Sequence, residues 1–188
     1  MGTVLVDVTI SLDGFMAGPR ISPEHPMGEG GERLHEWLLN PTDELDAEVA
    51  RAVAPEVGAV VLGRGIYDVG RALWGGTPYP APSYVLTHRA HEPVTTPTGE
   101  FVFVTDGPRA ACALAREAAG DRSVAVMGAD VTQQFLRAGL LDDLHVHIAP
   151  CLLGDGLRLF DRLAPGDVEQ VASRSSAKMT HLRYRVVR

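Results

Sequence analysis

The sequence predicts an α/β domain built in three layers (α/β/α), with helices on both faces of a mixed, mainly parallel sheet and an antiparallel C-terminal extension. Two observations predict it. Short apolar runs bounded by glycine, such as Gly58–Leu62, alternate with segments of helical periodicity, which is typical of buried parallel strands and their crossover helices. Towards the C-terminus, apolar and polar residues alternate with period two, which favours antiparallel strands. We expect residues 1–188 to form a single domain.

The predicted elements follow one another along the chain. Runs of β-branched and apolar residues predict strands at 3–10, 58–62, 83–86, 101–104 and 123–127. Capping residues and helical spacing predict a helical turn at 34–39 and helices at 43–54, 63–73, 107–119 and 130–138. The alternating residues place the two antiparallel strands at 144–149 and 179–187.

Residues 11–33 have a different character, because they contain eight glycine or proline residues and few apolar ones. A loop of this length is uncommon inside a compact domain and is usually functional or mobile. We therefore expect the segment Gly14–Gly31 to act as a lid over a pocket.

Composition narrows the class of protein. The chain carries a formal net charge of −7, with 45% hydrophobic and 22% charged residues, which is ordinary for a globular domain. An acidic chain is not expected to bind nucleic acid or an anionic membrane, although an anionic small molecule needs only a local cationic pocket. No membrane-length apolar run, signal-peptide pattern or cysteine framework is evident. We expect a soluble, cytoplasmic protein that acts on a small molecule.

Three predicted strands end in small or cationic residues. They are followed by Gly63-Arg64-Gly65, by Thr87-His88-Arg89 and by Gly128-Ala129-Asp130. In open α/β sheets, ligands bind at this carboxyl edge. Glycine lets the backbone approach a phosphate, the free N–H groups of the following helix attract it, and arginine adds a bidentate charge. Taken singly, each group is better explained by a tight turn or a solvated arginine; together they predict a phosphate cradle.

The cradle does not match the two commonest nucleotide motifs. Residues Val8–Gly18 read VTISLDGFMAG, so G-x-G-x-x-G is absent after the first strand, and no G-K-[ST] occurs. The sequence therefore predicts another nucleotide-binding fold.

Four segments resemble the dihydrofolate-reductase-like superfamily: SLDGFMAG (Ser11–Gly18), VVLGRGIYD (Val60–Asp68), YVLTHR (Tyr84–Arg89) and the long block Val124–Phe160. More narrowly, they are similar to the reductase domain at the C-terminus of the bifunctional riboflavin-biosynthesis deaminase–reductase, in its stand-alone form. The resemblance implies a dihydrofolate-reductase-like mixed sheet, an NADPH-dependent reductase and a homodimer. It also implies hydride transfer to a C=N or C=O group of a pyrimidine- or pteridine-like substrate, as in 5-amino-6-(5-phosphoribosylamino)uracil reductase.

The resemblance also implies roles for individual residues. Gly63, Arg64, Thr87, His88, Arg89, Gly128, Ala129 and Asp130 would bind NADPH. Ser11, Gly154 and Gly156 would line the substrate site, with Asp13 as the candidate catalytic residue. Apart from the resemblance, the aromatic Trp74 in the proline-rich loop is a candidate to stack on a planar substrate ring, with cover for the sheet edge as the alternative. For Asp13, a turn-forming role before glycine is an equal alternative. Two positions depart from the family pattern, since Met127 and Asp155 stand where glycine is frequent.

Two alternative functions stay open, and one pair of histidines has to be considered as a metal site. The departures favour a nucleotide-binding module without turnover, and a reductase of secondary metabolites would share the same fold. His145 and His147 lie on one strand face at metal-compatible spacing, but without a third ligand nearby we expect a cross-strand polar contact or a subunit interface, and no metal. Cys112 is expected in the core.

Overall fold

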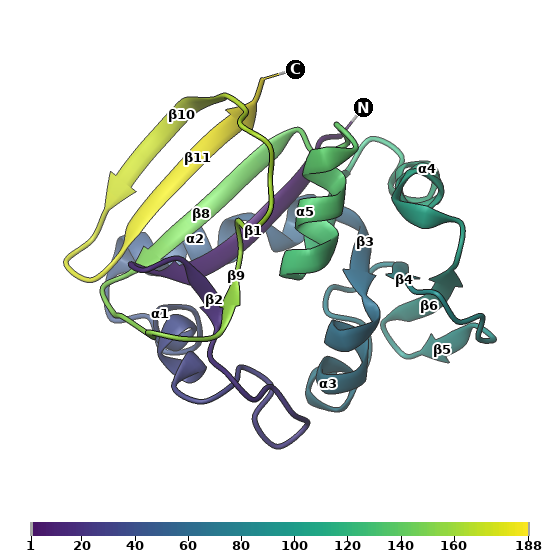
Figure 1. Cartoon of the computed structure of the whole chain (residues 1–188), viewed down its shortest axis with the longest axis horizontal. Coiled ribbons are helices and arrows are strands. Elements are labelled where there is room, and N and C mark those ends of the chain that lie inside the picture. Colours follow the sequence, from purple (N-terminus) through teal and green to yellow (C-terminus); the bar gives the residue numbers. More distant parts are fainter. Residues whose placement is uncertain (1, 188) are drawn as a thin grey trace.

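The computed structural model describes residues 2–187, which form a three-layer α/β/α structure (Figure 1). Its strands are β1 (Val4–Ser11), β2 (Phe15–Ala17), β3 (Val57–Gly63), β4 (Ser83–Leu86), β5 (Val94–Thr96), β6 (Gly99–Val104), β7 (Ser123–Met127), β8 (Asp143–Ala149), β9 (Leu157–Arg158), β10 (Val168–Ser175) and β11 (Thr180–Val186). Its helices are α1 (Glu36–Leu39), α2 (Glu44–Ala52), α3 (Arg64–Trp74), α4 (Gly107–Ala119) and α5 (Ala129–Arg137), with short 3-10 turns η1 (Gly31–Leu34) and η2 (Ala54–Glu56).

Within the described chain, nine strands form one sheet in the order β10-β11-β8-β1-β7-β3-β4-β6-β5. The strands from β8 to β6 in this order are parallel to one another. The sheet is antiparallel at both ends, where β11 and β10 extend it on one side and β5 on the other. The prediction of a mainly parallel sheet with an antiparallel C-terminal extension is confirmed.

Helices cover both faces of the sheet because the central strands are apolar on both sides. On one face, Ala111 and Ala115 of α4 and Phe135 of α5 pack into a core cluster with β1, β3 and β7. On the other face, Tyr67 of α3 packs into a second cluster, and Trp37 of α1 belongs to a third. Figure 1 shows α5 in front of the sheet and α2 behind it. Cys112, at 4% exposure, lies in the first cluster as expected.

Three details of the structure differ from the sequence prediction. The segment 11–33 is not a continuous loop, because it contains β2 and the turn η1, and β2 pairs with the distant β9. Strand β8 alternates like an antiparallel strand, yet it is parallel to β1 and antiparallel only to β11. Strands β5 and β10 were not predicted, since β5 has three residues and β10 is exposed along most of its length and interrupted by an irregularity between Gln170 and Ala172.

Among residues 2–187, no helix is both long and apolar enough to cross a membrane.

Candidate active site

Two glycine-led helices begin side by side at the carboxyl edge of the sheet. Strands β3 and β7 are neighbours, with Leu62 in register with Met127, and each leads directly into a helix. On the far side of β3, Gly63 is in register with Leu86, the last residue of β4. The structure therefore brings the three predicted strand ends together, because they belong to adjacent parallel strands.

The two helix N-termini leave their amide groups available. Gly63 caps α3 and Gly128 caps α5, and neither end has a side-chain cap hydrogen bond. Gly128 has φ +98°, and a Cβ there would lie 3.0 Å from the Cγ1 atom of Ile66. A Cβ at Gly65 would meet nothing within 4 Å, so the start of α3 is open. Uncapped N–H groups and a close backbone approach are what a phosphate requires, so these residues fit a dinucleotide pyrophosphate.

Arg64 is held in place beside the first turn of α3. Its Nε donates to Asp68 Oδ1 at 2.8 Å. Its guanidinium carbon lies 5.5 Å from the Tyr67 ring centroid and 5.8 Å from that of Phe103. Stacking on aromatic rings orients the planar guanidinium and leaves its remaining N–H groups for an anion.

The loop after β4 carries the second cationic group. Thr87 is half-buried and its Oγ1 accepts from the backbone N–H of Arg89 at 3.2 Å. The side chains of His88 and Arg89 are exposed. Asp130, at the start of α5, is also exposed and accepts from the Gln134 side-chain amide at 2.7 Å, whereas Ala129 is buried. Thr87 thus shapes the turn, and Arg89 is free to reach an anion.

On the other side of the edge, Asp13 joins two loops that are far apart in sequence. One carboxylate oxygen accepts from the Ser11 hydroxyl at 2.5 Å and the Leu153 backbone N–H at 3.1 Å. The other oxygen accepts from the Gly154 backbone N–H at 2.8 Å. Gly156 completes the junction, because a Cβ there would lie 2.1 Å from the carbonyl oxygen of Ala17. We call this set of contacts the Asp13 junction.

These hydrogen bonds lower the pKa of Asp13 to about 2, with the Ser11 hydroxyl as the largest cause. The carboxylate is therefore ionised at neutral pH and serves as an acceptor for loop amides. Ser11 itself is fully buried and also accepts from the Phe15 backbone N–H at 3.0 Å. This geometry favours the structural alternative for Asp13, while its catalytic role stays a prediction.

Trp74 is not brought together with the rest of the candidate site. It is the last residue of α3, about 15 Å along the helix from Arg64. Its indole packs over Gly70, where a Cβ would lie 2.3 Å from the Trp74 ring. Trp74 therefore lies at the end of α3 remote from the cradle.

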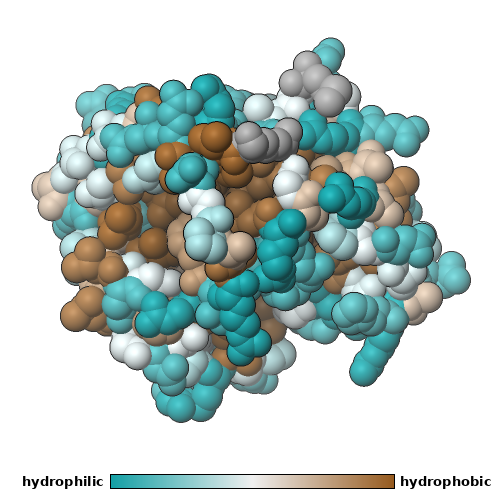
Figure 2. Space-filling view, turned by 45° about the horizontal axis from the view of Figure 1, so that its top comes forward, coloured by the Kyte–Doolittle hydropathy of each residue, from teal (hydrophilic) through white to brown (hydrophobic). Residues whose placement is uncertain are grey.

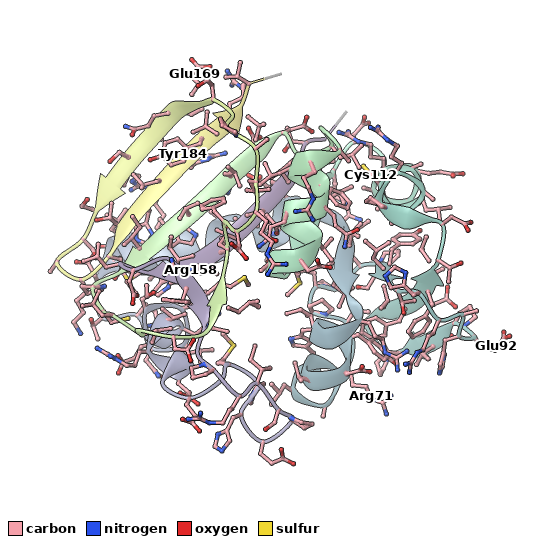
Figure 3. All side chains as sticks on the ribbon, in the orientation of Figure 1. Arg71, Glu92, Cys112, Arg158, Glu169 and Tyr184 are labelled. Atoms are coloured by element: carbon pink, nitrogen blue, oxygen red, sulfur yellow. The ribbon has the colours of Figure 1, made fainter. Side chains whose placement is uncertain are left out.

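Sequence reasoning missed Arg158 on β9. Its guanidinium carbon lies 4.2 Å from the Phe15 ring centroid, and its Nη1 donates to the Asp13 carbonyl oxygen at 3.0 Å. Figure 3 shows Arg158 near the centre of the view, in contrast to Glu92 and Glu169 at the periphery. An arginine in a two-residue strand gives no periodic signal; only its place two residues after the Gly154–Gly156 loop could have pointed to it.

The two departures from the family pattern have separate structural roles. Met127 is half-buried and packs against the second core cluster. Asp155 is exposed, and its Oδ1 accepts from the Gly156 backbone N–H at 2.8 Å.

The histidines of β8 form cross-strand contacts, as expected. His147 Nδ1 lies 2.8 Å from His181 Nδ1, and the Arg183 Nε donates to His145 Nε2 at 3.1 Å. In the described part of the chain, no three histidine, cysteine or acidic side chains are arranged to hold a metal ion.

The family model of the RibD C-terminal domain matches residues 2–182. The chain belongs to this family. The fold and the recognition of the family from its motifs are confirmed. An oxidoreductase is thus the class of enzyme that the family supports.

Three individual proteins are similar to this chain over most of its length. A protein from Shewanella sp. PV-4, named for riboflavin biosynthesis, is 25% identical, with a TM-score of 0.77 over 99% of both chains. The Bacillus subtilis protein YwjB, uncharacterised, is 26% identical over 160 residues, covering 83% of this chain and 81% of that protein. The Thermotoga maritima diaminohydroxyphosphoribosylaminopyrimidine deaminase/5-amino-6-(5-phosphoribosylamino)uracil reductase shares the fold, with 16% identity and a TM-score of 0.63. This chain spans 57% of that bifunctional protein.

Proposed function

We propose that this RibD C-terminal domain protein is an NADPH-dependent reductase that reduces a C=N or C=O group of a small pyrimidine- or pteridine-like molecule. The observation that carries the proposal is the pair of uncapped, glycine-led helix N-termini of α3 and α5, adjacent at the carboxyl edge of the sheet. The reductase relatives and the two arginines at the same edge support it.

Different groups of the cradle would bind different phosphates of the cofactor. The N–H groups at the starts of α3 and α5 would hold the pyrophosphate, since both ends carry partial positive charge. Arg64 and Arg89 would bind the 2′-phosphate, which is the feature that distinguishes NADPH from NADH. The bound cofactor supplies the hydride, so the protein needs no covalent nucleophile.

The other half of the edge would hold the substrate. The Asp13 junction fixes the loop Leu153–Gly156 against the end of β1. Arg158, stacked on Phe15, presents N–H groups next to this loop and would orient a polar substituent of the substrate. Holding both reactants in fixed geometry is the main contribution that such a site makes to the rate of hydride transfer.

The substrate class rests on resemblance. The Thermotoga maritima relative is named as a 5-amino-6-(5-phosphoribosylamino)uracil reductase, and we propose a substrate of similar chemistry for this chain.

The double variant Arg64→Ala/Arg89→Ala tests the cofactor assignment. We expect NADPH affinity to fall by roughly a hundredfold, because each lost charged hydrogen bond contributes about 1.5 kcal/mol or more, while NADH affinity changes little. The matched control is Arg51→Ala/Arg185→Ala, which removes two exposed arginines of α2 and β11. Equal losses for both cofactors in the site variant would contradict the 2′-phosphate role.

A second candidate is a nucleotide-binding module without turnover. Met127, which fills the position before Gly128 with a bulky side chain, is the observation that favours it. Oxidation of NADPH with any pyrimidine or pteridine acceptor would exclude this candidate; tight binding without oxidation across such a panel would support it.

We further propose a homodimer formed through the apolar face of β8 and β11. A groove of about 560 Å³ lies there, lined mainly by apolar side chains of these strands and the segment 160–168. Figure 2 shows hydrophobic side chains gathered in a hollow on this side of the molecule. An exposed apolar groove of this kind suits a subunit interface.

A further inference from the structure

Strand β9 carries Arg158, yet it consists of two residues and both are exposed. Strands in globular proteins usually have about 3–10 residues, because a shorter one forms too few hydrogen bonds to hold its own position. The position of Arg158 in the proposed substrate half of the site therefore depends on the contacts that β9 makes with other elements. These contacts come from β2, from the core and from helix α5.

The first two contacts fix the course of the β9 backbone. Strand β9 is antiparallel to β2, with Arg158 in register with Phe15 and Leu157 in register with Ala17. Just after the strand, the side chain of Leu159 is almost fully buried in the first core cluster. Hydrophobic burial is non-directional, so the core contact leaves the exact distance between β9 and the neighbouring helix to polar contacts.

The polar contact with the helix comes from Gln133 of α5. Its side-chain Nε2 lies 3.2 Å from the carbonyl oxygen of Arg158 and 3.0 Å from that of Leu159. Carbonyl oxygens only accept, so the amide N–H groups of Gln133 face them and donate to both. Gln133 and Arg158 are 25 positions apart in the sequence, and Figure 1 shows β9 beside α5. The Gln133 side chain thus joins the two elements directly.

Helix α5 gives Gln133 a rigid base. Val131 and Phe135, two positions before and after it, are almost fully buried in the first core cluster. Gln133 itself is half-buried. It lies one helical turn beyond Ala129, the first residue of α5, or about 6 Å along the axis from the amides proposed to hold the pyrophosphate. The helix that would bind the cofactor therefore also holds β9.

At the other end of this connection, Arg158 reaches the Asp13 junction. Its Nη1 donates to the Asp13 carbonyl oxygen at 3.0 Å, and its guanidinium lies over the Phe15 ring. The backbone carbonyl of the same residue accepts from Gln133. Arg158 is thus held from the proposed substrate half through its side chain and from the proposed cofactor half through its backbone.

We propose that Gln133 is a positioning residue of the reductase site, which holds Arg158 at a fixed distance from the start of α5. The inference rests on the proposed function, because it takes the cradle as the cofactor half and the Asp13 junction with Arg158 as the substrate half. Gln133 acts through β9 and is assigned no contact with either reactant. Hydride transfer is sensitive to such placement, since a displacement of about 1 Å can cost about a hundredfold in rate.

A positioning role implies a specific pattern of kinetic changes. The amides of the first turn of α5 do not involve the Gln133 side chain, so the affinity for NADPH should not depend on it. The loss should appear in kcat, because the two bound reactants are no longer held in the geometry of transfer. A purely structural role would lower the thermal stability and leave kcat of the folded protein unchanged.

The test uses Gln133→Glu in the full-length protein, with 5-amino-6-(5-phosphoribosylamino)uracil as the probe substrate and saturating NADPH. Glutamate has nearly the size of glutamine, but its carboxylate only accepts and cannot donate to the two carbonyls. We expect kcat to fall about tenfold while the Kd for NADPH, measured by calorimetry, changes by less than about twofold. Gln133→Lys, whose ammonium group donates, should recover most of kcat. Gln170→Ala, at an exposed glutamine of β10, is the control and should keep the wild-type kcat.

The outcomes separate this inference from the proposed function. A wild-type kcat in Gln133→Glu, or equally low kcat values in Gln133→Glu and Gln133→Lys, would overturn the role of Gln133 and leave the proposed function intact. A wild type that does not bind NADPH would overturn the proposed function itself. A wild type that binds NADPH but does not reduce the probe would refute the pyrimidine assignment and, with it, the role of Gln133.

Discussion

Asp13 shows how a side chain predicted for chemistry acquires a structural role. Its carboxylate accepts from one hydroxyl and two backbone amides, so it fixes the loop Leu153–Gly156 as firmly as a capping residue fixes a helix. In Asp13→Asn, the side-chain amide would turn an N–H group towards at least one of these donors. We expect a higher KM for the substrate with unchanged NADPH affinity, measured by steady-state kinetics and calorimetry.

The Ser11 hydroxyl donates to this carboxylate and is the largest cause of the lowered pKa of Asp13. A lowered carboxyl pKa stabilises the fold above about pH 4, and that stabilisation is lost as pH falls towards about 2. In Ser11→Ala we expect the acid limb of the melting-temperature profile to move to higher pH. Thr3→Ala, which removes another hydroxyl just before the start of β1, at the opposite end of the strand from Ser11, is the control. An unchanged acid limb would show that Ser11 does not lower the pKa of Asp13.

The sequence predicted which strand end a residue follows, but it did not predict contacts between residues that are far apart in the chain. Gly63, Arg64 and Gly128 were predicted at one edge because parallel strands end there, and they do lie together. The hydrogen-bond partners of Asp13 could not be predicted from the sequence, since Leu153 and Gly154 lie about 140 positions away in the chain. Trp74 was assigned because an aromatic ring can stack on a planar substrate, and the length of α3 places it away from the cradle.

Helix α5 depends on the glycine at its start. In Gly128→Ala, the side chain meets both a φ of +98° and the Ile66 Cγ1 atom at 3.0 Å. We expect a loss of about 1–3 kcal/mol of stability and a much weaker binding of NADPH, because the helix N-terminus must shift. Gly120→Ala is the matched control, with φ +61° and nothing within 4 Å. It should lose stability and keep the cofactor. If both variants keep it, the start of α5 is not a phosphate site.

Elements with strong periodicity were predicted well, and those defined by their partners were not. Buried strands such as β3 and β7 are apolar on both faces, and that pattern is local. The orientation of β8 depends on the helix that precedes it. The alternation of apolar and polar residues predicted its antiparallel pairing with β11 but not its parallel pairing with β1. Strand β10 pairs only with β11 and exposes both faces, which leaves no hydrophobic signal in its sequence.

The assembled molecule leaves one apolar face open, and the proposed dimer would cover it. Phe160 and Val168, at 46% and 48% exposure, line the groove beside β8 and β11. In Phe160→Glu/Val168→Glu we expect a monomer by sedimentation equilibrium, since buried charges without partners oppose association. The control is Leu73→Glu, which is 63% exposed on α3 and should leave the dimer intact. A wild type that sediments as a monomer would refute this interface.

The central claim is that adjacent ends of β3, β4 and β7 form a cradle for the phosphates of NADPH. Calorimetric titration of the wild type with NADPH, and separately with NADH, tests it most directly. We predict one site per chain and an affinity for NADPH at least about tenfold higher than for NADH, which corresponds to about 1.4 kcal/mol from the 2′-phosphate. No heat with NADPH, or equal affinity for the two cofactors, would contradict the account.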